Sequence, residues 1–116
     1  GKPVYHGTTL RDQQIEDIYR KLKNNESFQF GFFTSAGLRI EDGEKYMTKD
    51  RGEMAEDERM VLFYIDAKTA KDVTNLRWWT DTHEAIIGHD KEYEVIDIQL
   101  KKGYTEIKLR ELWIQI

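Results

Sequence analysis

Two stretches of the sequence combine side chains that are suited to binding or converting a ligand. The first, Val4-Tyr5-His6-Gly7-Thr8-Thr9, places an imidazole, a glycine and two hydroxyls next to one another. Glycine lets the backbone approach a ligand closely, and hydroxyls both donate and accept hydrogen bonds. The second stretch carries two carboxylates, Glu92 and Glu94, at the start of an apolar segment. Such groups are typical of functional sites when a cleft holds them.

The first stretch is expected to lie where a strand passes into a helix. Val4 and Tyr5 are typical of the end of a short strand, and Thr9 with Asp12 approximates a capping box. The residues that follow place one apolar face on a helix, namely Ile15, Ile18, Tyr19 and Leu22. We therefore expect His6 at a strand-to-helix junction, where binding groups are common. The alternative is a structural histidine followed by an ordinary turn glycine.

The second stretch is predicted to be a strand over residues 92–100. With a period of two, Glu92 and Glu94 share a face with Ile96, Ile98 and Leu100. Because these apolar residues should face the core, the pattern predicts that both glutamates begin the same inward row. Burying carboxylates without partners is costly, so a cleft is expected there. The alternative is that the row begins outside the sheet, with both glutamates in water.

The rest of the chain predicts short elements of both kinds. An extended segment is expected at Phe28–Phe32, a helix at Ile40–Met47, and a buried strand at Met60–Ile65. Residues 48–59 are almost wholly charged and predict a solvated loop. Further predictions are a helical turn at 68–73, a short helix from 80 to 87, and a last strand over 104–116 with a bulge near Arg110-Glu111. The chain is therefore expected to be α+β, with mainly antiparallel strands.

Composition limits the classes of protein that the chain can represent. Its 116 residues are enough for one domain, complete or cut from a larger chain. The balance of 18 Lys and Arg against 22 Asp and Glu argues against an extended nucleic-acid-binding face. The absence of cysteine excludes thiol catalysis, disulfides and cysteine zinc sites. No apolar run reaches about 18 residues, so no membrane span is predicted.

His83-Glu84 invites a zinc interpretation that its surroundings do not support. A zinc-protease helix needs a second histidine four residues after the first, but that position is Ile87. His89 comes two positions too late. We therefore predict no metal site.

Three motifs, in order along the chain, resemble those of the ADP-ribosyltransferase superfamily, which includes bacterial toxins and poly(ADP-ribose) polymerase-like enzymes. Tyr5-His6-Gly7-Thr8 resembles the first motif. Gly31-Phe32-Phe33-Thr34-Ser35, followed by Tyr46, resembles the second, and Glu92-Tyr93-Glu94-Val95-Ile96 resembles the third. The resemblance implies a single catalytic domain over residues 1–116, with split antiparallel sheets and short helices.

The resemblance also implies roles toward NAD as co-substrate. His6 and Gly7 would hold its ribose and nicotinamide amide, with Thr8 beside them. The toxin branch has arginine at the position of His6, so His6 favours the polymerase-like branch. Phe33 stands where that branch has a stacking tyrosine. Ser35 resembles the toxin serine, and Tyr46 would cover the other face of the nicotinamide.

The third motif is compatible with two assignments. A toxin-like Glu-x-Glu makes Glu94 catalytic, with Glu92 acting on the acceptor, whereas a polymerase-like Glu-Tyr makes Glu92 catalytic. We prefer Glu94, because Val95, Ile96 and Asp97 continue from it as in the toxins. A carboxylate can stabilise the oxocarbenium-like ribose that forms when the nicotinamide bond breaks, and a second can orient or deprotonate the acceptor.

The expected activity is therefore mono-ADP-ribosyl transfer from NAD to a macromolecule, a protein rather than a nucleic acid, without a metal or a membrane. The protein would be soluble, acting in the cytosol or delivered into a target-cell cytosol as an effector or toxin domain. An NAD glycohydrolase and a pseudoenzyme that binds NAD, ADP-ribose or a protein partner are alternatives within the same fold. An unrelated α+β binding module is the alternative outside it.

Overall fold

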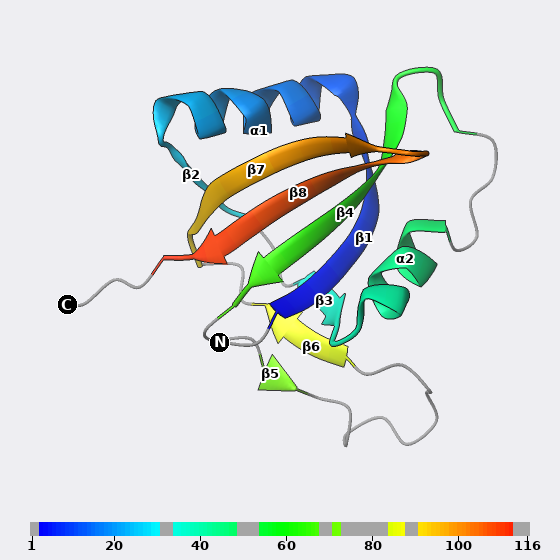
Figure 1. Ribbon diagram of the computed structural model, residues 1–116, viewed down its shortest axis with the longest axis vertical. Helices are drawn as coiled ribbons and strands as arrows, with labels where there is room; N and C mark the ends of the chain where they lie inside the picture. The colour runs from blue at the N-terminus through cyan, green and yellow to red at the C-terminus, as the bar shows by residue number, and fades with distance from the viewer. Residues whose placement is uncertain are drawn as a thin grey trace.

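The computed structural model describes residues 3–30, 34–48, 54–67, 71–72, 84–87 and 91–112, with backbone only at 34–35, 46, 48, 71–72 and 84–87. The strands and helices follow one another along the chain in a mixed order (Figure 1). They are β1 (Pro3–Arg11), α1 (Asp12–Asn24), β2 (Ser27–Phe28), β3 (Thr34–Gly37), α2 (Ile40–Thr48), β4 (Glu58–Asp66), β5 (Lys71–Asp72), β6 (Glu84–Ile87), β7 (Tyr93–Lys101) and β8 (Tyr104–Glu111).

The strands form one sheet in the order β2-β7-β8-β4-β1-β3-β6-β5. The pair β4–β8 is parallel and the other pairs are antiparallel. The most apolar stretch, predicted as a buried strand, is confirmed as β4 at the sheet centre, where Val61, Phe63 and Ile65 are at most 2% exposed. The predicted α+β class is confirmed.

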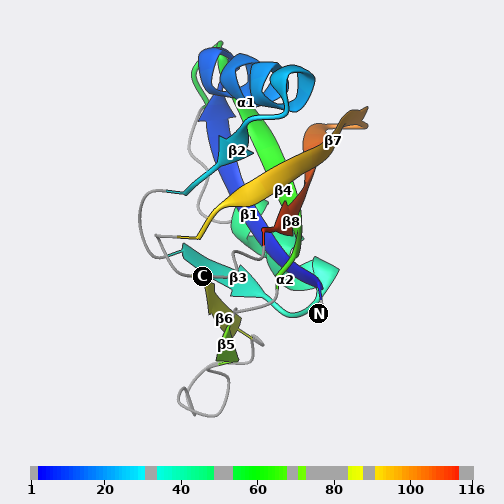
Figure 2. The same cartoon turned by 90° about the vertical axis from the view of Figure 1, so that its left-hand side faces the viewer.

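The sheet divides between β1 and β3. Along its other edge β1 pairs with β4 from Pro3 to Arg11, but within the described residues its pairing with β3 is limited to Tyr5 and Gly37. The short strands β3, β6 and β5 consequently stand apart from the long strands (Figure 2). This division is the split that the family resemblance implies.

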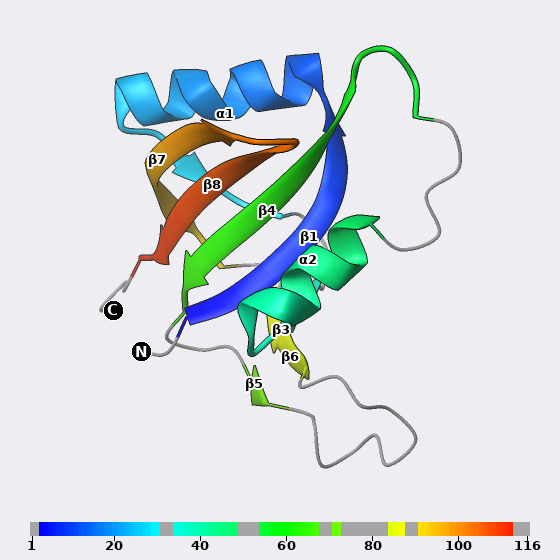
Figure 3. The same ribbon diagram turned by 45° about the vertical axis from the view of Figure 1, so that its right-hand side comes forward.

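The two helices pack on different parts of the sheet (Figure 3). Helix α1 lies across the long strands and places Ile18 in the core, with Ile15 and Leu22 against it. Tyr19, predicted on the same face, is 48% exposed and lies under the Lys23 ammonium instead. The cap also differs from prediction, because the backbone N–H of Arg11 donates to the Gln14 side chain and Thr9 stays within β1.

Helix α2 packs against β1 through two glycines. A Cβ on Gly7 would lie 1.9 Å from the Gly43 carbonyl oxygen, and one on Gly43 would lie 2.7 Å from the Cβ of Tyr5. Only hydrogen atoms at both positions allow the helix and strand backbones to approach this closely. The helix predicted at residues 40–47 is confirmed as α2, and Gly43 within it is part of what seats it on β1.

The prediction that Glu92 and Glu94 begin an inward row is wrong. Tyr93 and Val95, at 0% and 4% exposure, face the core, so the alternating glutamates face the other way. A β-bulge between Val95 and Asp97 adds one residue, which leaves Ile96 exposed and returns Ile98 to the core face. The bulge predicted on the last strand thus lies on its partner, while β8 alternates regularly up to Glu111.

Two predicted helical segments are strands where the structure describes them. Lys71 and Asp72 form β5 rather than a helical turn, and residues 84–87 form β6 rather than the end of a short helix. Both are extended because they pair with neighbours, β5 with β6 and β6 with β3. A segment this short lacks a periodicity that separates helix from strand.

Candidate functional site

The division of the sheet exposes one edge of β1 beside the first motif. After the pair Tyr5–Gly37, the described parts of β1 and β3 show no further ladder pair, although His6-Gly7-Thr8 and Thr34-Ser35-Ala36 continue along the two strands. Backbone N–H and C=O groups along the edge of a strand can hydrogen bond a ligand. The strands that carry the first two motifs are thus neighbours, and they part at the motif residues themselves.

His6 lies in the middle of β1, not at a strand-to-helix junction as predicted. The strand continues to Arg11 because all of its residues pair with β4. The imidazole is half-buried against aromatic rings, 5.8 Å from the Phe30 centroid and stacked at 5.9 Å on Phe63. Phe30 in turn contacts Tyr93 at 5.5 Å. His6 therefore faces the same side of the sheet as Tyr93.

The structure gives Gly7 and Thr8 different surroundings. Gly7 is buried where α2 crosses β1, so the need for glycine is explained by helix packing, and its proposed role toward nicotinamide stays a prediction. Thr8 is partly buried and its hydroxyl lies 3.5 Å from the Thr9 carbonyl oxygen. Both residues lie on β1 at the edge where the sheet divides.

The second motif is described only in part. Phe33 lies outside the described residues, while Ser35 and Tyr46 are placed by their backbones on β3 and α2. Both elements lie beside β1. The motif's strand and helix thus border the first motif, and the roles of these three residues stay predictions.

Tyr5, which precedes the first motif histidine, lies on the α2 side of β1. Its ring meets that of Tyr64 edge to face at 5.3 Å, and Gly43 of α2 approaches its Cβ. Burial raises the pKa of the Tyr5 phenol, and the neighbouring Tyr64, Glu41 and Glu106 add to the shift.

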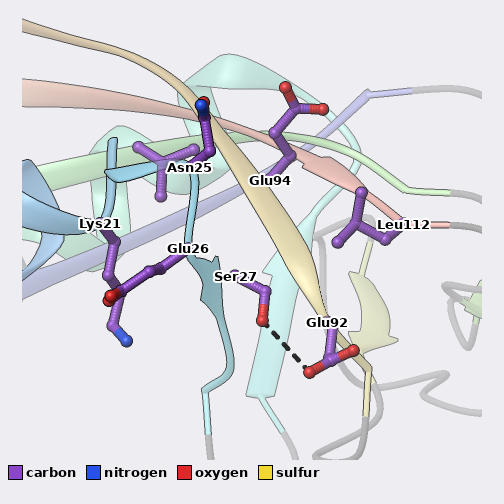
Figure 4. A pocket seen from close by; sticks show the side chains of 8 residues that line it. Lys21, Asn25, Glu26, Ser27, Glu92, Glu94 and Leu112 are labelled. Atoms are coloured by element: carbon purple, nitrogen blue, oxygen red, sulfur yellow. Dashed lines mark hydrogen bonds between the residues drawn. The ribbon is translucent and has the colours of Figure 1, made fainter. Parts of the chain in front are cut away.

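Glu92 and Glu94 lie together on the outer face of β7, the face turned away from Tyr93. They border a cavity of about 410 Å³ between β7, β2 and the end of α1 (Figure 4). Glu92 accepts a hydrogen bond from the Ser27 hydroxyl at 3.1 Å, and Glu94 pairs with Arg110 at 2.5 Å while 44% exposed. Other residues lining the cavity are Lys21, Asn25, Glu26, Val95 and Leu112. Both glutamates thus have partners on adjacent strands.

The structure does not bring these glutamates together with His6. His6 faces the core-side aromatics that include Tyr93, whereas Glu92 and Glu94 flank Tyr93 on the opposite face. Strand β7 is also separated from β1 by β8 and β4. The geometry therefore gives no shared crevice for His6 and Glu94.

A different glutamate lies next to the first two motifs. Glu84 opens β6, the strand beside β3, and its register partner is Gly37, the residue that also pairs with Tyr5 of β1. The sequence analysis weighed Glu84 only as part of a zinc motif within a helix. A glutamate followed by an apolar run, Ala85-Ile86-Ile87, was the signal that could have identified it, since Glu94-Val95-Ile96 has the same pattern. Strands β1, β3 and β6 thus meet at Tyr5, Gly37 and Glu84, which we call the sheet joint.

Within the described residues, no group of three or more His, Cys, Asp or Glu is arranged to hold a metal ion. Neither of the two described helices is long and apolar enough to cross a bilayer.

Solved structures similar to this fold include ADP-ribosyltransferases and a type III effector from bacteria. The Vis toxin of Vibrio splendidus, in complex with an inhibitor, superposes with a TM-score of 0.69 at 14% identity, over 96% of this chain and 48% of the toxin. HopU1 of Pseudomonas syringae gives a TM-score of 0.73 at 15% identity, over 96% and 45%. The type III effector XopAI of Xanthomonas axonopodis gives 0.64 at 11% identity, over 96% and 41%.

Sequence comparison adds nothing to this likeness, since no protein-family model and no curated protein sequence matches the chain. The chain spans about half the length of the similar structures. At these identities the likeness concerns the fold alone, and it agrees with the motif order and the divided sheet. The protein therefore has the fold of the ADP-ribosyltransferase superfamily.

Proposed function

We propose that this domain is an NAD-dependent mono-ADP-ribosyltransferase that transfers ADP-ribose to a protein acceptor. One observation carries the proposal: in a fold shared with ADP-ribosyltransferases, the strands bearing the first two motifs are neighbours and part at His6-Gly7. The edge of β1 that faces β3 carries backbone groups that can hydrogen bond the nicotinamide amide, and His6 on the same strand carries a ring nitrogen that can hydrogen bond the ribose.

The chemistry asks for a carboxylate near this edge. Breaking the bond between nicotinamide and ribose leaves positive charge on the sugar, which a nearby anion stabilises. We assign this role to Glu84 on strand order alone, because β6 is separated from β1 only by β3, whereas β7 is separated from β1 by β8 and β4. In the register Glu84 falls on the same strand face as Gly37 and Tyr5, so it approaches the first motif from the α2 side and not from the face of His6. Glu94 remains the competing assignment from the motif pattern, with Glu92 acting on the acceptor.

The proposed setting follows from the proteins that share the fold. The similar structures are toxins and type III effectors, so we propose that the domain acts as an effector or toxin domain in the cytosol of a target cell. NAD is then the co-substrate.

The decisive assay measures nicotinamide release and transfer of labelled ADP-ribose from NAD to a cell lysate. Agmatine, which one Vis structure contains, serves as a small acceptor. We expect Glu84→Gln to lower nicotinamide release about 100-fold or more, as loss of an electrostatic stabiliser does. Glu94→Gln and Glu92→Gln are matched charge-removing controls, expected to stay within about threefold of wild type because both side chains are paired on the outer face.

Each alternative has its own outcome in this assay. Nicotinamide release without label on any acceptor identifies an NAD glycohydrolase. Thermal stabilisation by NAD without turnover identifies a pseudoenzyme of the same fold. Loss of activity with Glu94→Gln but not with Glu84→Gln would return the catalytic role to Glu94. No binding and no turnover would contradict the proposal.

A further inference from the structure

Two aromatic rings contact the His6 imidazole, and they come from different parts of the chain. Phe63 of β4 is the register partner of His6 and stacks on it, with the ring planes 27° apart and the centroids at 5.9 Å. Phe30 follows β2 outside any described strand and meets the imidazole edge to face, at 84° and 5.8 Å. The centroids of Phe30 and Phe63 are 5.2 Å apart, so Phe30 touches both members of the stacked pair.

A histidine on a strand does not fix the orientation of its own ring. Rotation about the Cβ–Cγ bond has two broad minima, so the ring nitrogens of the partly exposed His6 could point in several directions. Stacking on Phe63 alone would still tolerate sliding of one ring over the other. A third ring in contact with both limits that movement. The two contacts together therefore determine where the ring nitrogens of His6 point.

Phe30 is itself held by the core. Its ring contacts Tyr93 at 5.5 Å and Phe28 at 5.0 Å in addition to Phe63. Tyr93 and Phe63 are at most 2% exposed. Phe30 also directly precedes Gly31, where the second motif begins. The ring beside the first-motif histidine is thus anchored to buried residues and adjoins the second motif in sequence.

We propose that Phe30 is a positioning residue for His6, which together with Phe63 holds the imidazole so that a ring nitrogen meets the NAD ribose. This inference rests on the proposed function, in which His6 binds that ribose. Hydrogen bonds weaken steeply when donor and acceptor are misaligned, so an imidazole that turns freely binds the ribose less well. A side chain already held in its binding orientation also avoids the entropy cost of being ordered by the ligand. Phe30 thus acts through His6 on the affinity for NAD.

Phe30→Leu tests the proposal because it removes the ring but keeps an apolar side chain. We expect the Kd for NAD, measured by isothermal titration calorimetry, to rise about tenfold, as when one hydrogen bond to a ligand is lost. The kcat of nicotinamide release at saturating NAD should stay within about threefold, because the ribose contact is made in the ground state and in the transition state alike. Phe30→Tyr keeps the ring and should hold the Kd within about twofold of wild type.

Phe28→Leu is the matched control. Phe28 contacts Phe30 at 5.0 Å and Phe63 at 5.9 Å in the same cluster, but none of its described ring contacts is with His6. Both leucine variants lose one ring from this cluster, so their melting temperatures should fall by similar amounts, whereas the Kd should rise only in Phe30→Leu. Equal rises in Kd would indicate a general loss of packing and overturn the proposal, as would an unchanged Kd in Phe30→Leu.

Two further readouts depend on the path through His6. In a His6→Ala background, Phe30→Leu should not change the Kd further, because the imidazole transmits its effect, and an undiminished effect overturns the proposal. The imidazole C–H resonances of His6, assigned by their loss in His6→Ala, should shift in Phe30→Leu and shift less in Phe28→Leu. They are observed without NAD, so unshifted resonances in Phe30→Leu overturn the proposal whether or not the protein binds NAD. A wild-type protein that neither binds nor converts NAD contradicts the proposed function instead.

Discussion

The sheet joint and the outer face of β7 both carry acidic residues at the start of a strand, but the surrounding structure differs. At the start of β7, Glu94 forms an ion pair with Arg110 of β8, and Glu92 accepts a hydrogen bond from Ser27 of β2, so both carboxylates have partners on neighbouring strands. At the joint the sheet comes apart, β1 and β3 diverge beside His6, and a buried Asp42 oxygen lies next to Gly37. A satisfied acidic pair is typical of a stable surface, whereas unused hydrogen-bonding capacity indicates a ligand site.

The largest expected effect is a loss of stability when the packing of α2 against β1 is disturbed. Gly7→Ala would drive a methyl group into the Gly43 carbonyl oxygen, which would lie 1.9 Å away. The added Cβ would also lie 2.6 Å from the backbone nitrogen of Met47. Because these two neighbours are backbone atoms, they cannot move aside, and we expect a loss of about 3 kcal/mol in the free energy of unfolding. Urea denaturation measures this loss.

Gly103→Ala is the matched control for that substitution. Gly103 has φ +90° in the β7–β8 turn, but nothing lies within 4 Å of the added Cβ. We expect only the cost of the left-handed conformation, about 1 kcal/mol. Equal losses for the two alanine variants would show that α2 is not seated through Gly7.

The β-bulge on β7 determines which residues after Glu94 face the core, and it leaves Ile96 exposed. Deleting Ile96 removes the extra residue and leaves Val95 opposite Leu109, Asp97 opposite Lys108 and Ile98 opposite Ile107, so the unfolding free energy should change by less than about 1 kcal/mol. Deleting Ile98 instead moves Gln99 into the core position, with an expected loss of about 2 kcal/mol. A costlier deletion at Ile96 than at Ile98 would contradict this description of the strand.

The smallest expected effect concerns the ion pair on the outer face. Glu94 and Arg110 are 44% and 52% exposed, so their coupling is screened by water. A double-mutant cycle with Glu94→Gln and Arg110→Gln should give a coupling free energy of at most about 1 kcal/mol. A coupling of several kcal/mol would mean that the pair is buried in solution, and the contrast between the two regions would lose its basis.

The sequence predicted elements whose signal is local. The length and residue types of the apolar run 60–65 predicted a buried strand. The spacing of Ile15, Ile18 and Leu22, which puts them on one helix face, predicted α1. Strand β6 could not be predicted in this way, because a four-residue segment is extended only through its pairing with β3. The face of β7 was predicted wrongly for a related reason. An alternating pattern does not say which of its two sets of residues faces the core. The β-bulge at Ile96 also shifts the alternation by one residue, which leaves Ile96 exposed.

The parts of the candidate site that lie in short, unbroken sequence motifs could be predicted. The motifs around His6 and Ser35 were identified by residue type, and the structure places the two strands that carry them, β1 and β3, side by side. The catalytic carboxylate was assigned to Glu94 because Val95, Ile96 and Asp97 continue from it as the strand does in the toxins. Topology favours Glu84 instead, since strand order is set by long-range pairing that no short pattern encodes.

NMR observation of backbone amides during titration with NAD tests the location of the site most directly, and it does not depend on turnover. We predict that the largest shift changes fall on His6-Gly7-Thr8, on residues 34–37 and on Glu84, with little change at Ser27, Glu92, Glu94 and Leu112. Shift changes concentrated on those four residues would place the ligand on the outer face of β7 and contradict the assignment of the site to the sheet joint.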